Sequence, residues 1–386
     1  MSDWIHSLPI VWMAVVLFGL TYLAAAAIWV FVHVLATRLH AHARSFSSGM
    51  LSPLGTLFAL FVVSAFGTLN AQKPVWQPSP GHSEVPIWPG AVPDQQRTAG
   101  REESRWWPEA PTGPPGGFEV YHVSRPTITV YSPREKNAGV AVVVFPGGGY
   151  TNLAINLEGT EVCDWLTSRG ITCVLLKYRV PGEEYYPKPA PYPKSGPYPE
   201  SPMALEDAQR TLGLVRLHAA EWHIDPHKIG VLGFSAGGHL VAATSTHFAK
   251  RLYPAVDDAD KESCRPDFAV ALYPGHLTIS ATKHDASLAR GSRPRIVTSN
   301  SGLNPDIQVT RLTPPTFLVQ AVDDPVDSVE NSLVYFAALK KAGVPVEIHL
   351  YAHGGHAFGL RPTKLPISQW PRLVETWLGT IGMISG

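Results

Sequence analysis

The sequence has no excess of charge of either sign, because 31 lysines and arginines balance 31 aspartates and glutamates. A chain without net charge has no overall field that would attract nucleic acid or another anionic polymer. The sequence also lacks an H-E-x-x-H pattern and any H-x-E pattern combined with C-x-x-C, so a zinc-dependent mechanism has no support. A G-x-x-x-x-G-K-[ST] phosphate-binding loop is missing as well. These absences argue against nucleic-acid binding, metal catalysis and nucleotide hydrolysis.

Cysteine is scarce, with three in 386 residues, so the sequence does not predict a disulfide framework. Cys163 lies in a helical pattern and Cys173 in an apolar strand pattern. Both are predicted to be small core residues. Internal repeats and tracts of extreme low complexity are absent too. The 45% hydrophobic content supports a substantial core, and the length fits one large domain or two ordinary ones.

Two long apolar runs stand near the N-terminus. Residues 10–36 are almost wholly apolar and exceed the roughly 20 residues that a helix needs to cross a bilayer, so we expect a transmembrane helix. Residues 54–69 form a second, shorter run, which is either another span or the core of a cleaved signal peptide. Arg38 and Arg44 lie between the runs, which places that loop in the cytoplasm by the positive-inside bias.

The chain is therefore predicted to have three parts. Residues 1–71 form a membrane anchor with one or two spans. Residues 72–117 form a linker rich in proline and tryptophan that partly wraps the C-terminal domain. Residues 118–386 form this folded domain. We expect the domain to lie outside the cytoplasm, in the periplasm or the extracellular space. The domain would be secreted if the second apolar run is cleaved.

Apolar strands and amphipathic helices alternate through the folded domain, which predicts a mostly parallel sheet with helices on both faces. The first two strands look like the edge of an antiparallel start. The predicted strands cover residues 118–123, 127–131, 139–145, 171–178, 229–232, 267–272, 315–322 and 346–351, and the predicted helices cover residues 156–169, 203–222, 236–249, 328–342 and 367–381.

A G-x-S-x-G pentapeptide at residues 233–237 lies between the predicted strand at 229–232 and the helix after it. A serine on such a sharp strand-to-helix turn has its hydroxyl pushed out of the backbone, and the glycines permit close approach of neighbouring backbone. Ser235 is therefore the candidate nucleophile. The alternative is a glycine-rich turn without chemistry.

A serine nucleophile also needs amide donors for the oxyanion. The run P-G-G-G-Y at residues 146–150 directly follows a predicted strand, and its glycines expose amides without side chains in the way. We expect the N–H groups of Gly148, Gly149 and Ala236 to be the donors. The alternative for the glycine run is a flexible turn.

The remaining needs are a base and a carboxylate that orients it. His356 lies in a glycine-rich loop after the last predicted strand and is the candidate base, whereas His353 is expected to brace the loop. Three aspartates follow the strand at 315–322. Asp324 is the first choice for the acid and Asp323 the second, while Asp327 is expected to help start the next helix, either as its N-cap or through the helix dipole.

Four motifs together carry a resemblance to a known family: PGGGY, GFSAGGHL, AVDDPVDSVENS and GGHAFGL, all within residues 139–360. The stretch resembles the acetyl esterase branch of the α/β-hydrolase superfamily, near acetylxylan and feruloyl esterases. It departs from the family at Pro146, where the loop of relatives has histidine, and at Ser328, where many have proline. Neither departure touches Ser235, Asp324 or His356.

The resemblance implies an α/β-hydrolase fold and a serine esterase for short acyl esters, with O-acetyl groups of carbohydrate as the preferred substrate. It implies no cofactor and no metal. Tyr150, with Tyr185 and Tyr186 in the proline-rich stretch 181–202, is expected to bind substrate. That stretch could equally be a stiff lid packed on itself. The sequence does not indicate an oligomeric state.

Other classes fit less well. A feruloyl or generic short-chain carboxylesterase is the nearest alternative. A serine peptidase of the prolyl oligopeptidase type usually carries tyrosine after the nucleophile, whereas Ala236 follows Ser235 here. A non-catalytic binding protein of the same fold normally lacks a member of the triad. A glycosidase would need paired carboxylates flanking a sugar cleft, which the motifs do not mark.

Overall fold

The computed structural model describes residues 75–94, 100–107, 116–180, 202–278 and 302–385. The chain divides into the units Met1–Ala71 and Gln72–Gly386, and every described residue belongs to the second unit. No helix among the described residues has the length and apolar character that a membrane span requires. The predicted spans at residues 10–36 and 54–69 lie outside the described residues.

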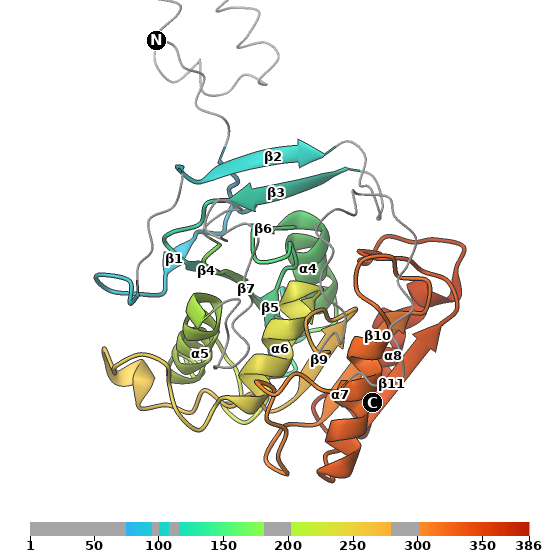
Figure 1. Ribbon diagram of the computed structural model, residues 1–386. Helices are drawn as coiled ribbons and strands as arrows, with labels where there is room; N and C mark the ends of the chain where they lie inside the picture. Colours follow the sequence, from blue (N-terminus) through green and yellow to red (C-terminus); the bar gives the residue numbers. More distant parts are fainter. Residues whose placement is uncertain (1–74, 95–99, 108–115, 181–201, 279–301, 386) are drawn as a thin grey trace, which may run out of the picture. The chain divides into compact units, whose positions relative to one another are not determined.

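A central sheet of eight strands organises the domain, in the order β1-β4-β7-β5-β8-β9-β10-β11 (Figure 1). Neighbouring strands are parallel from β7 to β11, while β4 pairs antiparallel with β7 and β1 antiparallel with β4. The predicted mostly parallel sheet is therefore confirmed. The strands are β1 (Val85–Pro86), β4 (Thr127–Tyr131), β5 (Ala141–Phe145), β7 (Thr172–Lys177), β8 (Ile229–Phe234), β9 (Ala269–Leu272), β10 (Thr316–Ala321) and β11 (Val346–Tyr351).

The central strands are buried on both faces, which explains their continuous apolar runs. Every residue of β5, β7, β8 and β10 is buried. Two layers of helices cover the sheet. The helices are α4 (Glu161–Ser168), α5 (Pro202–Leu217), α6 (Ala236–Thr246), α7 (Glu330–Lys341) and α8 (Trp370–Thr380), with short turns at η1 (Asn156–Thr160), η3 (Asp258–Asp260) and η4 (Pro366–Gln369).

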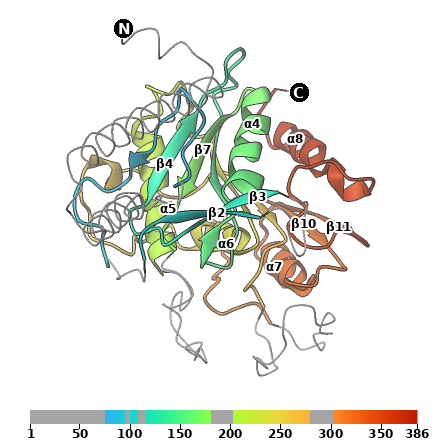
Figure 2. The same cartoon turned by 90° about the horizontal axis from the view of Figure 1, so that it is seen from above.

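Helices α4 and α8 lie side by side on one face of the sheet, and α5 lies across the sheet from them (Figure 2). Trp165 on α4 packs edge-on against Trp370 on α8, with ring centroids 5.4 Å apart. Its Nε1 also donates a hydrogen bond to Glu375 on α8 at 2.9 Å. Helix α5 contacts α6 on the opposite face. Large aromatic contacts thus fix the C-terminal helix to the middle of the chain.

The stretch predicted as a linker contributes two strands. β1 joins the edge of the central sheet, and β2 (Glu103–Trp107) pairs with β3 (Gly117–Tyr121), which pairs with β6 (Asn152–Leu153) in a separate three-stranded sheet. Trp88 is 4% exposed and donates from Nε1 to Asp207 on α5 at 2.9 Å. The sequence pattern indicated neither strand, because two- and five-residue strands between prolines show no usable alternation.

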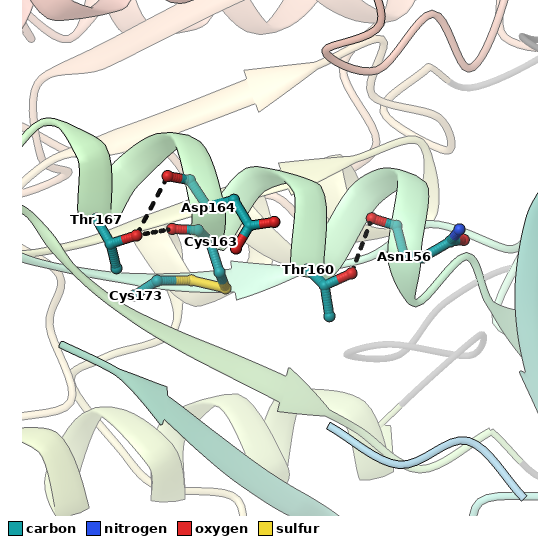
Figure 3. Close-up of a disulfide and its surroundings, with 6 residues drawn as sticks. All are labelled: Asn156, Thr160, Cys163, Asp164, Thr167 and Cys173. Carbon is teal, nitrogen blue, oxygen red and sulfur yellow. Dashed lines mark hydrogen bonds between the residues drawn. A yellow bond between two sulfur atoms is a disulfide. The ribbon is translucent and has the colours of Figure 1, made fainter. Parts of the chain in front are cut away.

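Cys163 on α4 and Cys173 on β7 form a disulfide, which the sequence analysis did not predict (Figure 3). Both side chains are fully buried, as predicted for core residues, and Cys264 is a buried free thiol. Each periodicity marked a buried face. Neither could show that the helix returns onto the strand after it, which brings the two Cα atoms to 5.1 Å.

Candidate active site

Ser235 occupies the turn between β8 and α6 with a left-handed backbone, at φ 52° and ψ −119°. A Cβ at Gly233 would lie 2.2 Å from the carbonyl oxygen of Gly237, and one at Gly237 would lie 2.1 Å from that of Phe145. Both flanking positions therefore require glycine. The G-x-S-x-G pattern is a packing requirement of this turn, which holds the strained serine in place.

Three side chains far apart in the sequence meet at this turn. His356 Nε2 lies 3.0 Å from Ser235 Oγ, and His356 Nδ1 lies 2.8 Å from Asp324 Oδ2. All three residues are at most 9% exposed. Tyr273, after β9, packs edge-on against the imidazole with ring centroids 4.8 Å apart. The structure thus brings together the three residues that the motifs predicted as nucleophile, acid and base, and their catalytic role stays a prediction.

The turn after β10 gives the two competing aspartates different contacts. Asp324 Oδ1 accepts the backbone N–H of Val326 at 2.8 Å and of Asp327 at 3.0 Å, which leaves Oδ2 facing His356. Asp323 instead accepts the N–H groups of Gly354 and Gly355 and contacts His353 Nδ1. Asp323 therefore fixes the loop that carries His356, while Asp324 contacts the imidazole itself.

Asp327 does not cap helix α7, so the expectation that it is the N-cap is wrong, while an effect through the helix dipole stays a prediction. Helix α7 begins at Glu330 with Val329 at its N-cap and no side-chain cap. Asp327 Oδ2 accepts a hydrogen bond from Ser235 Oγ at 3.2 Å and lies 3.9 Å from His356 Nε2. Burial raises the pKa of Asp327, against the lowering effect of the nearby His356 and His276. A second carboxyl group thus lies beside the candidate nucleophile.

The nearby carboxyl groups also change the pKa of His356. Burial disfavours the charged imidazolium. The hydrogen bond that His356 donates to Asp324 and the negative charges of Asp327, Asp324 and Glu158 outweigh burial, and the pKa of His356 is raised above its ordinary value. A raised pKa makes the imidazole a stronger base for the Ser235 proton.

The glycine loop after β5 passes beside the nucleophile. A Cβ at Gly147 would lie 3.0 Å from Ser235 Cβ, and one at Gly148 would lie 2.0 Å from the carbonyl oxygen of Asn152. Tyr178 donates from its hydroxyl to the carbonyl oxygen of Pro146 at 2.5 Å, which braces the start of the loop. Within the described part of the chain, the amides of Gly148 and Gly149 donate to no acceptor. They are available for a bound oxyanion, as is the N–H of Ala236 in the first turn of α6.

Glu158 is the residue beside the site that the motifs missed. Its carboxylate accepts the N–H of Gly147 at 2.7 Å and the hydroxyl of Tyr273 at 2.8 Å. Burial raises the pKa of Glu158, although both hydrogen bonds oppose the shift. The only signal in the sequence was a carboxylate next to Gly159 within the stretch predicted as a helix. Glu158 links the glycine loop to the tyrosine that packs on His356.

The predicted substrate-binding tyrosines have different outcomes. Tyr150 is 3% exposed, and its hydroxyl lies 2.7 Å from Nδ1 of His239, one helical turn after the nucleophile. Its ring also packs near His276, with centroids 6.1 Å apart. Tyr150 thus packs against His239 and His276 at the end of the glycine loop. Tyr185 and Tyr186 lie outside the described residues. Across the described ranges, no group of three His, Cys, Asp or Glu side chains is placed to hold a metal ion.

The geometry agrees with what comparisons with known proteins find. The model of a family described as alpha/beta hydrolase fold matches residues 142–360. A solved structure of an acetyl ester-xyloside bifunctional hydrolase from Caldicellulosiruptor lactoaceticus superposes with a TM-score of 0.58 at 33% sequence identity, covering 78% of this chain and 97% of that one.

Two curated relatives are similar over part of their length. The chain is 30% identical over 233 residues to an acetylxylan esterase of Xylanibacter ruminicola, covering 58% of this chain and 42% of the relative. It is 28% identical over 251 residues to an endo-1,4-beta-xylanase B of Butyrivibrio fibrisolvens, covering 62% of this chain and 35% of the relative. The chain therefore spans less than half the length of these relatives.

Proposed function

Because this chain belongs to the alpha/beta hydrolase fold family, we propose that it is a serine carboxylic-ester hydrolase for short acyl esters, acting by preference on O-acetyl groups of carbohydrate. The observation that carries the proposal is the hydrogen-bonded chain Ser235–His356–Asp324, with separations of 3.0 and 2.8 Å, on a strained strand-to-helix turn. A hydroxyl is a weak nucleophile, and this arrangement is what activates it.

In the first step, Ser235 Oγ attacks the ester carbonyl carbon while His356 Nε2 takes the hydroxyl proton. Asp324 holds the imidazole through Nδ1 and stabilises the imidazolium that forms. The N–H groups of Gly148, Gly149 and Ala236 stabilise the negative charge that develops on the carbonyl oxygen. His356 then gives its proton to the leaving alcohol oxygen, which leaves the acyl group on Ser235.

In the second step, water replaces the alcohol. His356 Nε2 takes a proton from water as its oxygen attacks the acyl carbon, and the same amide donors bind the second oxyanion. The proton returns to Ser235 Oγ as the carboxylic acid leaves. The free hydroxyl and the neutral imidazole are restored, so no cofactor is consumed.

The preference for acetylated carbohydrate rests on the names of the relatives, an acetylxylan esterase and an acetyl ester-xyloside hydrolase. A feruloyl or generic short-chain carboxylesterase is the alternative within the same chemistry. A serine peptidase of the prolyl oligopeptidase type is disfavoured, because Ala236 stands where those enzymes usually have tyrosine.

We also propose that the domain lies outside the cytoplasm, held to a membrane by the apolar segments within residues 1–71 or secreted. The disulfide between Cys163 and Cys173 supports this location, because disulfides persist in oxidising compartments and are rare in the cytosol. The membrane contact itself rests on the two apolar runs and their basic loop.

The test is acetate release from acetylated xylan, measured beside p-nitrophenyl esters of increasing acyl length. We expect turnover of acetyl esters that falls as the acyl chain grows. Ser235→Ala should lower kcat by about 10⁴-fold or more with the fold unchanged, since the nucleophile is lost while binding remains. A Ser235→Ala variant that keeps a kcat within about 10-fold of the unaltered protein would refute the assignment.

A further inference from the structure

Asp327 places a carboxyl group where neither step above uses one. Asp324 already occupies Nδ1 of His356 at 2.8 Å. Asp327 faces the other nitrogen, with Oδ2 3.9 Å from His356 Nε2 and 3.2 Å from Ser235 Oγ. This nitrogen exchanges protons with the substrate, so the carboxyl group of Asp327 lies next to the reacting atoms.

The surrounding backbone is shaped around this side chain. A Cβ at Gly275 would lie 2.6–2.9 Å from the carboxyl atoms of Asp327, so only glycine leaves room for them. Gln320 Nε2 donates to the carbonyl oxygen of Asp327 at 2.8 Å, and the Asp327 amide donates to Asp324 at 3.0 Å. The side chain itself is 15% exposed. Asp327 is thus fixed from three sides and still reachable from the site.

The reaction geometry decides which part of a substrate meets Asp327. His356 Nε2 must approach the leaving alcohol oxygen to about 3 Å in order to protonate it. Asp327 Oδ2 lies 3.9 Å from the same nitrogen. The oxyanion, by contrast, is negative and needs N–H donors, so a carboxyl group has no use on that side. The group next to Asp327 is therefore the alcohol part of the ester.

We propose that Asp327 is a specificity residue that accepts a hydrogen bond from a second hydroxyl group of the leaving alcohol. This hydroxyl is on the carbon next to the one that bears the ester oxygen. This inference rests on the proposed esterase function and deepens it by naming the alcohol as a diol or polyol, such as a sugar. An alkyl alcohol has no donor to offer and leaves the partly buried carboxyl group without a hydrogen bond from the substrate, which disfavours its ester.

Two esters that differ in one group test this proposal. Propyl acetate and 2-hydroxyethyl acetate have alcohols of the same length, and the second ends in a hydroxyl in place of a methyl group. We expect the protein to show a kcat/KM about 10- to 100-fold higher for 2-hydroxyethyl acetate. Asp327→Ala should bring the ratio of the two values close to one, and Asp327→Asn, which keeps one acceptor oxygen, should give an intermediate ratio.

The control is Asp258→Asn, which removes an exposed carboxylate paired with Lys261 away from the site and should leave the ratio unchanged. The proposal is overturned if the protein does not distinguish the two esters, or if Asp327→Ala keeps the original ratio. In either case, activity on p-nitrophenyl acetate still upholds the esterase function. If the protein hydrolyses none of propyl acetate, 2-hydroxyethyl acetate and p-nitrophenyl acetate, the esterase function is overturned, and this inference falls with it.

Discussion

Three carboxyl groups lie around Ser235, and each contacts a different partner. Asp324 holds the imidazole of His356, Asp327 accepts from the serine hydroxyl, and Glu158 holds the glycine loop. Burial raises the pKa of Asp327 and of Glu158. Together these groups raise the pKa of His356 despite its burial. The pKa of His356, the proposed base, therefore depends on all three carboxyl groups around it.

Glu158→Gln tests this dependence. One glutamine oxygen cannot replace both carboxylate oxygens, so either the amide of Gly147 or the hydroxyl of Tyr273 loses its buried acceptor. We expect kcat/KM for p-nitrophenyl acetate to fall about 10- to 100-fold. His356 must be neutral to act as a base, so activity is lost as pH falls through its pKa. Losing a nearby negative charge lowers that pKa, so the acid limb of the pH profile should move to lower pH.

The matched control for this prediction is Glu161→Gln, because Glu161 begins the following helix and forms a partly exposed ion pair with Arg361. It should leave both kcat/KM and the acid limb where they are. An unchanged pH profile in Glu158→Gln, with melting temperature and kcat/KM also unchanged, would show that Glu158 does not position the site.

The sequence motifs identified some of these residues and missed others for a physical reason. Ser235 and His356 lie in turns whose glycines are visible in the sequence. Asp324 could not be separated from Asp323 by pattern, because the choice depends on which carboxylate the turn amides bind. Glu158 lies in a helical stretch, where its burial follows from the folded position of the glycine loop.

The site is carried by loops at the carboxyl ends of five neighbouring strands, β5, β8, β9, β10 and β11. Parallel strands deliver such loops to one edge of a sheet. The apolar runs of these strands were sufficient to predict them. The short strands β1 and β2 and the disulfide were not predictable, because each depends on a partner elsewhere in the chain and leaves no periodic signal of its own.

The disulfide between α4 and β7 gives a test of the proposed location. Protein taken from cells, denatured without reductant and treated with a maleimide polymer, should gain one label at Cys264 and three labels after reduction. The reason is that a domain outside the cytoplasm folds where disulfides form and persist. A protease added to spheroplasts should degrade the domain, or the domain should be found in the medium.

Cys264→Ser is the control for the labelling, since it should remove the single label seen without reductant. Three labels without reductant, together with a domain that stays protected in intact spheroplasts, would contradict the location outside the cytoplasm.

The complete fold is what makes the proposed chemistry available. Ser235 follows β8, Asp324 follows β10 and His356 follows β11, and the three meet only because β9 holds these strands in one sheet. The glycine loop after β5 reaches the same point from the other side of β8. The proposed reactivity of Ser235 would therefore be a property of the assembled domain and not of its local sequence.

The measurement that tests this central claim most directly is the reaction of the folded protein with a fluorophosphonate, read by mass spectrometry. An activated serine displaces fluoride and keeps the phosphonyl group, so we expect one adduct, on Ser235, and none after denaturation. His356→Ala should label at least about 100-fold more slowly, because the general base is missing. An adduct on another residue, or labelling of His356→Ala at the unchanged rate, would contradict the account.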